Sequence, residues 1–183
     1  FTRPILVLPG VYTLVSYLTN PNADAYGEVT PYTIRVFDAK NILIGEKTGS
    51  TYIMPGGSTP IVETGFKSGG REPARAVLSI PEDTKLIRFR GDDNRPTISR
   101  RILSDETTLP RLEVTMSNPH LEEFSELEVA AIVFDTSGNA RAASVTVIKS
   151  LKSDESKTVV FTWPTPFGFT PGRIDVLPRV SPL

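Results

Sequence analysis

The sequence predicts an all-β protein built from two similar antiparallel β-sandwich domains in tandem. Apolar and polar residues alternate over short runs, which is the pattern of strands with one buried face. Pro, Gly, Asn and Asp separate these runs, and such residues favour turns. In addition, the segment from Leu112 to Asp135, LEVTMSNPHLEEFSELEVAAIVFD, has the same layout as the segment from Leu14 to Asp38, LVSYLTNPNADAYGEVTPYTIRVFD. The chain therefore contains an internal repeat of two copies.

The spacing of the repeat predicts that each copy is a domain. Asn20-Pro21 recurs as Asn118-Pro119, 98 positions later, and Val36-Phe37-Asp38 recurs as Val133-Phe134-Asp135, 97 positions later. The offset then returns to 98, where Ser58 matches Ser156, Val62 matches Val160 and Arg75 matches Arg173. These changes of offset fall in predicted turns, where chains tolerate insertions. The period exceeds the roughly 20–50 residues of a solenoid repeat, so each copy should fold as its own unit.

The repeat also decides between helix and strand in the second copy. After Asn118-Pro119, the apolar residues Leu121, Phe124 and Leu127 have helical spacing. The first copy has Gly27 and Pro31 in the same window, and a proline costs a helix interior about 3 kcal/mol. If both copies share one fold, each must form a loop followed by a strand. A single helical turn from Leu121 to Phe124 stays possible.

The strands predicted in the first copy begin with a short edge strand. In order they cover Ile5 to Leu8, Val11 to Leu18, Tyr32 to Phe37, Ile42 to Glu46, Thr51 to Met54, Thr59 to Phe66 and Arg75 to Ile80. Asn20 to Thr30 is predicted as a loop, and Asp38 to Asn41 as a hairpin turn. The second copy has predicted strands at Leu127 to Phe134, Ala140 to Ile148 and Ile174 to Leu177, and Ile102 and Leu103 are placed where Ile5 and Leu6 lie upstream. About seven short strands per copy are expected, as in a sandwich.

The boundary between the copies is predicted from a change in composition. Residues from Pro81 to Pro110 are mostly polar and charged, with apolar islands at Leu86 to Phe89 and Ile98 to Leu103. These islands are interpreted as the last strand of a first domain, residues 1–90, and the first strand of a second domain, residues 91–183. The linker would be only Gly91 to Pro96, which restricts the angle between the domains.

Composition excludes several classes of function. The chain has 183 residues, 39 % of them hydrophobic, and a formal net charge of −1. This balance argues against a nucleic-acid partner, because phosphate binding needs clustered positive charge. The absence of cysteine excludes disulfides and thiolate metal sites. No run approaches the roughly 20 apolar residues of a transmembrane helix. No cofactor or small-molecule substrate is indicated by any motif.

Few residues are candidates for chemistry. His120 is the only histidine, and because no G-x-S-x-G motif accompanies it we interpret it as a surface loop residue. Asp92 and Asp93, near Asp83, offer hard oxygen ligands that calcium could use at the domain junction. The competing interpretation is a solvated turn, because the D-x-D-x-D-G spacing of a calcium loop is missing. These residues indicate no metal other than calcium.

Two apolar segments are candidates for interaction. Phe161, Trp163, Phe167 and Phe169 are separated by prolines and a glycine, which keeps the segment stiff. They either plug one end of a sandwich core or form an exposed surface for a sugar or a protein partner. Ile5 and Leu6 lie in the predicted first strand, whose edge could pair with another chain.

The segments that end in Asp38 and Asp135 resemble bacterial immunoglobulin-like surface modules of the FxLYD type. The resemblance rests on Tyr32 to Asp38 with Pro55-Gly56, and on Val129 to Asp135 with Gly138; Asp154-Glu155 replaces the Pro-Gly turn in the second copy. The whole chain, with its FTWPTPF and PRV tail, is also similar to envelope-associated bacterial proteins that carry such a pair after a membrane anchor. The resemblance implies immunoglobulin-like domains, an extracellular location and a membrane link only through a segment outside this chain.

We therefore expect a non-enzymatic, extracellular structural or interaction module of a cell-surface protein, with a protein partner. The alternative is a subunit of an extracellular filament or surface array, assembled when a terminal strand of one chain completes a sheet of the next. A calcium-dependent adhesin and an enzyme are more distant alternatives.

Overall fold

The computed structural model describes residues 1–91 and 95–180. These residues form strands, turns and bends and contain no helix. Every pairing between the described strands is antiparallel. The predicted all-β class is thereby confirmed, and so is the assignment of the segment after Asn118-Pro119 to a loop and a strand, because Phe124–Asp135 is a strand and residues 119–123 contain no helical turn.

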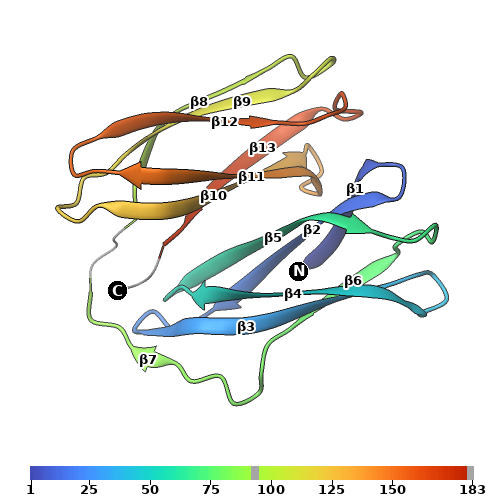
Figure 1. The fold of residues 1–183 in the computed structure, drawn as a ribbon, viewed down its shortest axis with the longest axis horizontal. Coiled ribbons are helices and arrows are strands. Elements are labelled where there is room, and N and C mark those ends of the chain that lie inside the picture. Colours follow the sequence, from blue (N-terminus) through green and yellow to red (C-terminus); the bar gives the residue numbers. More distant parts are fainter. Residues whose placement is uncertain (92–94, 181–183) are drawn as a thin grey trace. The chain divides into compact units, whose positions relative to one another are not determined.

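The described residues fall into two compact units, one up to residue 91 and one from residue 95 to 180. The first unit contains β1 (Thr2–Leu8), β2 (Val11–Asn20), β3 (Ala25–Phe37), β4 (Leu43–Ile53), β5 (Gly57–Lys67), β6 (Arg75–Ser79) and β7 (Ile87–Arg88). One sheet has the order β1-β2-β5 and the other the order β4-β3-β6, and β7 pairs separately with β3 (Figure 1).

The second unit has the same strand order as the first. It contains β8 (Thr97–Ser104), β9 (Arg111–Ser117), β10 (Phe124–Asp135), β11 (Ala140–Leu151), β12 (Ser156–Thr162) and β13 (Pro171–Arg179). Its sheets have the orders β8-β9-β12 and β11-β10-β13. Each strand from β1 to β6 therefore has a counterpart from β8 to β13 in the same place, and only β7 has none among the described strands.

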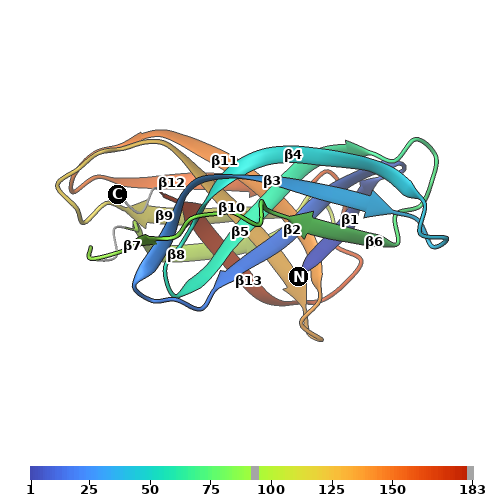
Figure 2. The same cartoon turned by 90° about the horizontal axis from the view of Figure 1, so that it is seen from below.

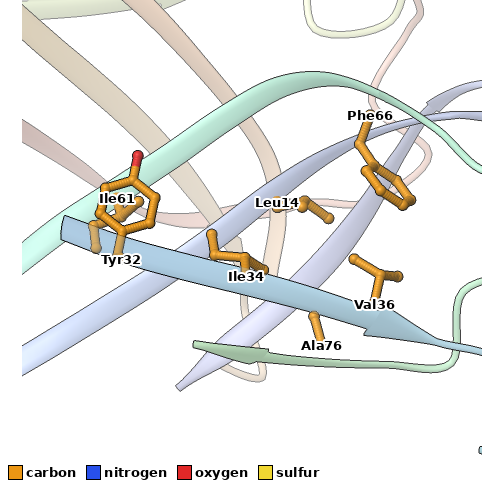
Figure 3. Close-up of a cluster of buried hydrophobic side chains, with 7 residues drawn as sticks. All are labelled: Leu14, Tyr32, Ile34, Val36, Ile61, Phe66 and Ala76. Atoms are coloured by element: carbon orange, nitrogen blue, oxygen red, sulfur yellow. The ribbon is translucent and has the colours of Figure 1, made fainter. Parts of the chain in front are cut away.

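Alternation of side chains along β3 builds the core of the first unit. Tyr32, Ile34 and Val36 are buried, whereas Arg35 between them is exposed. Figure 3 shows these three side chains pointing from β3 toward the other sheet, where Leu14, Ile61 and Phe66 lie. The cluster also includes Ile61 and Phe66 of β5 and Ala76 of β6. The core thus joins side chains of both sheets, and each fully buried Leu or Ile contributes about 1.5–3 kcal/mol of transfer free energy.

The second unit has a longer run of consecutive buried residues than the first. On β9, Leu112, Val114 and Met116 alternate inward and are 0 % exposed. On β10, every residue from Val129 to Phe134 is buried, on both faces of the strand. The sequence there is correspondingly apolar without alternation, as in strands that have no face in water.

Replacing Gly49 of β4 by alanine is expected to destabilise the first unit by about 1–3 kcal/mol, because the added Cβ would collide with the side chain of Tyr32. An added Cβ would lie 2.6 Å from Cζ of Tyr32. The tyrosine cannot easily move, because its hydroxyl donates to Oε1 of Glu63 at 2.5 Å. Urea denaturation measures the effect. Gly57→Ala is the control, since its nearest atom would be 3.7 Å away; equal losses at both positions would contradict the steric explanation.

Several predicted strand boundaries are wrong. The predicted loop from Asn20 to Thr30 is mostly strand, because β3 already begins at Ala25, and the runs predicted at Ile42 to Glu46 and Thr51 to Met54 are parts of the single strand β4. The second unit has six described strands, where about seven were expected. Propensity marks Gly27 and Pro31 as breakers, whereas both residues pair with β4.

The predicted equivalence of Ile102 and Leu103 with Ile5 and Leu6 is also wrong. Leu112 repeats Leu14, and it pairs with Leu103, whereas Leu14 pairs with Pro4. Leu103 therefore holds the place of Pro4. The two strands are joined by residues 9–10 in the first unit and by residues 105–110 in the second, so counting along the sequence misplaces the strand that precedes the longer loop.

Candidate functional site

A buried asparagine holds the loop after β2 in the first unit. Asn20 is 4 % exposed. Its Nδ2 donates to the carbonyls of Ala25 (2.8 Å) and Met54 (3.1 Å), and its Oδ1 accepts the amide of Asn22 (3.1 Å). One side chain thus ties the end of β2 to the start of β3 and to the end of β4.

The second unit repeats this arrangement with Asn118, which is 1 % exposed. Its Nδ2 donates to the carbonyls of Glu122 (2.8 Å) and Leu151 (3.0 Å), and its Oδ1 accepts the amide of His120 (3.0 Å). The repeated Asn-Pro sequence is therefore a structural clamp, since a buried polar side chain is stable only when its donors and acceptors are paired.

A second repeated residue, Asp38, closes the hairpin between β3 and β4. Its Oδ1 accepts the amides of Lys40 and Ile42, both at 2.9 Å. Its Oδ2 accepts a hydrogen bond from Nη1 of Arg71 at 2.9 Å. The amide of Ile42, desolvation acting in the opposite direction, the amide of Lys40 and the guanidinium of Arg71 together give Asp38 a pKa below its ordinary value.

Asp135 occupies the same place between β10 and β11. Its Oδ1 accepts the amides of Ser137 (3.0 Å) and Asn139 (2.9 Å). The hydrogen bond from the Asn139 amide is the largest cause that lowers the pKa of Asp135, with smaller contributions from Ser137 and from the positive charge of Arg141, against some desolvation. Both aspartates are acceptors for a turn, as the sequence indicates.

Asp135→Asn is expected to reduce the acid sensitivity of stability, because the folded pKa of Asp135 lies below its unfolded value. Such a carboxylate adds stability above the unfolded pKa of about 3.9, and that stability is lost as pH falls through the folded pKa. Urea titrations from about pH 7 to about pH 2.5 measure this. The wild type should lose its advantage over the variant across that acid range; a pH-independent difference between them would refute the assignment.

A repeated arginine lies over the aromatic ring that precedes each aspartate. Cζ of Arg75 lies 4.6 Å from the ring centroid of Phe37, and Cζ of Arg173 lies 4.0 Å from that of Phe134. Cation–π contacts of this kind contribute about 0.5–2 kcal/mol. The shared asparagine, aspartate and arginine thus have their functional groups engaged with neighbouring residues of their own unit.

The remaining candidate from the second copy, His120, lies in the loop after β9. Its Nε2 is 3.1 Å from the carbonyl oxygen of Arg95, and its ring makes an edge contact with Phe124 at a centroid distance of 6.1 Å. Within residues 1–91 and 95–180, no group of three or more His, Cys, Asp or Glu side chains could hold a metal ion. The calcium candidates Asp92 and Asp93 lie outside the described residues.

The aromatic candidates of the second unit are brought together. Trp163 is buried and makes an edge contact with Phe167 at 5.1 Å, and Phe167 stacks on Phe169 at 4.9 Å. Cζ of Arg141 lies 5.6 Å from the centroid of Phe169. Phe167 and Phe169 are half-buried. The inner ring thus belongs to the core, and the outer two leave part of their surface in contact with solvent.

Backbone hydrogen bonds hold this aromatic segment in place. The amide of Trp163 donates to the carbonyl of Pro110 at 3.1 Å, and the amide of Phe167 donates to the carbonyl of Glu106 at 2.8 Å. The loop from β12 to β13 is therefore fixed to the loop from β8 to β9. The indole Nε1 of Trp163 is buried and finds no hydrogen-bond acceptor among the described residues.

The other two interaction candidates point in opposite directions on β1. Ile5 is 6 % exposed and belongs to the core, whereas Leu6 is 60 % exposed. Leu8 on the same strand is 44 % exposed. As β1 is an edge of its sheet, Leu6 and Leu8 form an exposed apolar strip on an edge strand.

Sequence reasoning missed a pair of neighbouring hollows in the first unit. One has a volume of about 310 Å³ and is lined by residues including Glu28, Asp83 and Lys85. The next has a volume of about 320 Å³ and is lined by residues of β3, β4 and the end of β6. Both are open to solvent and share Pro31 and Pro81.

No protein-family model matches the chain, and no curated protein sequence matches it significantly. The described residues also include no helix with the length and apolar character needed to cross a bilayer.

Proposed function

We propose that the chain is a pair of immunoglobulin-like β-sandwich domains, residues 1–90 and 91–183, that acts as a non-enzymatic extracellular module of a cell-surface protein. The observation that carries the proposal is the shared strand order of the two units, β1-β2-β5 with β4-β3-β6 and β8-β9-β12 with β11-β10-β13. Sandwich architectures of this kind are shared by many cell-surface domains.

The use of the repeated polar residues supports a structural role. Asn20, Asp38 and Arg75 and their counterparts in the second unit bind backbone groups, turns and rings of their own unit. Duplication has thus preserved the residues that build the fold. We infer that specificity lies in surfaces that differ between the two units, and that the partner is a protein.

Surface proteolysis tests the location and role. Intact source cells treated with a protease that cannot enter them are expected to lose this protein while a cytosolic marker stays intact. Survival of the protein under these conditions would contradict the extracellular assignment. Turnover or stoichiometric binding of a small metabolite by the purified chain would contradict the non-enzymatic one.

The second candidate function is self-assembly into a filament or array by exchange of the terminal strand. It is favoured by the exposed leucines of the edge strand β1, Leu6 and Leu8. The residue before this strand, Phe1, stacks its ring on Tyr17 at a centroid distance of 5.3 Å. A strand that leaves its own sheet would offer Ile5 to the core of the next chain and leave its own groove open for another copy.

Electron microscopy distinguishes the two functions. If the chain assembles through β1, deletion of residues 1–9 should abolish polymers. Leu6→Lys provides a second variant whose fold should survive, because that side chain is exposed, and it should also prevent assembly by placing a charge on the edge. Polymers unaffected by both changes would exclude strand exchange.

A further inference from the structure

A gap interrupts the pairing along one side of β3. β6 pairs with residues Thr33 to Phe37, and β7 pairs with Ala25 and Tyr26. Figure 2 shows β6 and β7 following each other along the same side of β3. Residues 27–31 therefore have no strand partner on that side among the described residues. Between the two strands the chain swings away from β3 (Figure 1).

Two prolines explain where the pairing stops. The carbonyl of Thr33 faces β6, since it accepts from Oγ of Ser79 at 3.3 Å, and alternate residues of a strand face the same side. Pro31 therefore faces β6 as well. The register that pairs Thr33 with Ser79 would place Pro81 opposite Pro31. Neither proline has an amide hydrogen, so neither hydrogen bond of that pair can form.

The second unit shows what occupies the corresponding place. Ala130 pairs with Leu177 as Thr33 pairs with Ser79, and two residues further Glu128 pairs with Arg179. Nη2 of Arg179 also lies 3.0 Å from Oε2 of Glu128. In the second unit, β13 therefore continues to this position and places an arginine there. In the first unit, the proline pair leaves the same position beside β3 without a strand.

The chain of the first unit turns away and leaves the two hollows beside this gap. The carbonyl of Pro81 accepts the amide of Thr84 at 3.2 Å and its Oγ1 at 2.6 Å, which closes a turn. Glu28 and Asp83 line the hollow with Lys85, giving a net charge of −1. Val29, also in the lining, is 61 % exposed. The hollow combines acceptor groups with an apolar wall.

We propose that this open edge of β3 binds an extended, arginine-bearing segment of a partner protein, which pairs with residues 28–31 and places its guanidinium near Glu28 and Asp83. The occupant needs an extended backbone because it continues the sheet, as in strand addition generally. It needs a cationic donor because carboxylates line the hollow and guanidinium binds carboxylate in a directional way. This inference rests on the proposed role as an interaction module and names its partner chemistry.

A synthetic peptide that copies residues 174–180, Ile174 to Val180, is the probe, because it carries Arg179, which lies beside Glu128 of β10 at the position that the proline pair leaves open beside β3. It is titrated into the full chain labelled for NMR. Resonances of Val29, Thr30, Thr84 and Lys85 are expected to shift together. A peptide with glutamate at the arginine position should bind at least about tenfold more weakly, because attraction becomes repulsion.

Variants of the chain locate the site. Glu28→Lys with Asp83→Lys should weaken binding at least about tenfold, whereas Glu72→Lys, an exposed acid outside the hollow, should not change it. Pro31→Glu with Pro81→Arg restores the pair found in the second unit and should extend β6 across the gap. That closed variant is expected to lose peptide binding while remaining folded.

The proposal is overturned if the peptide leaves these resonances unshifted, if it binds elsewhere, or if the closed variant binds as well as the wild type. These outcomes are independent of the cell-surface assignment, which surface proteolysis tests. An extracellular protein with no binding at this edge would refute only the partner inference, and an intracellular protein that binds the peptide would refute only the location.

Discussion

Asn118→Ala is expected to lower the free energy of unfolding of the second unit by about 2–4 kcal/mol. The change leaves the carbonyls of Glu122 and Leu151 and the amide of His120 without their partner. Glu122 and His120 lie in the loop after β9, and Leu151 lies at the end of β11. The loop after β9 would therefore lose its attachment to β11. Trp163 is the only tryptophan and lies in the second unit, and its fluorescence during urea denaturation measures the loss.

Asn118→Asp separates the loss of hydrogen bonds from the loss of volume. The aspartate has the same shape, but it presents an acceptor where Nδ2 donates to two carbonyl oxygens. We expect a loss at neutral pH at least as large as that of the alanine variant, because a buried charge would face two acceptors. Wild-type stability in this variant would mean that the donors of Asn118 are not needed.

Trp163→Ala is expected to cost about 3–5 kcal/mol, the range for removal of a buried aromatic side chain. The ring is 6 % exposed and packs on Phe167, which in turn stacks on Phe169. Removing it would take away the inner member of the cluster and leave a cavity beneath the other two rings. Thermal unfolding followed by circular dichroism measures the loss, since the variant has no tryptophan fluorescence.

Trp163→Phe is the informative partner of this experiment. The indole Nε1 has no acceptor among the described residues, so its replacement removes a buried unsatisfied donor, which offsets part of the lost volume. We expect the phenylalanine variant to retain most of the stability that alanine loses. Equal destabilisation by phenylalanine and alanine would contradict this expectation.

The sequence was sufficient for the class of fold because one copy corrected the other. The residues after Asn118 have helical spacing, and only Gly27 and Pro31 in the first copy indicate a strand. The same comparison identified Asp38 and Asp135 as turn residues, since an aspartate before a short connection has a local backbone partner. Local signals of this kind act over a few residues, so they can be read along the chain.

Long-range register could not be read in this way. Pro31 and Pro81 are separated by fifty positions, and only the pairing of Thr33 with Ser79 shows that they would face each other. The predicted position of Leu103 was wrong for the same reason. The loop before β9 is longer than the loop before β2, so the register of β8 cannot be counted from the sequence. The hollows beside β3 and the unpaired donor of Trp163 are consequences of packing, which propensity does not encode.

Equivalent strands of the two units have side chains of different size at matching core positions. Tyr32 and Ile34 of β3 correspond to Val129 and Ala131 of β10, although both strands have the same neighbours. During synthesis, adjacent repeats with one strand order can exchange strands and become trapped. A strand of one unit would overfill or underfill the core of the other, which costs about 1–3 kcal/mol or more per mismatch. Divergence of the two cores thus guards each unit against misassembly with its neighbour on the same chain.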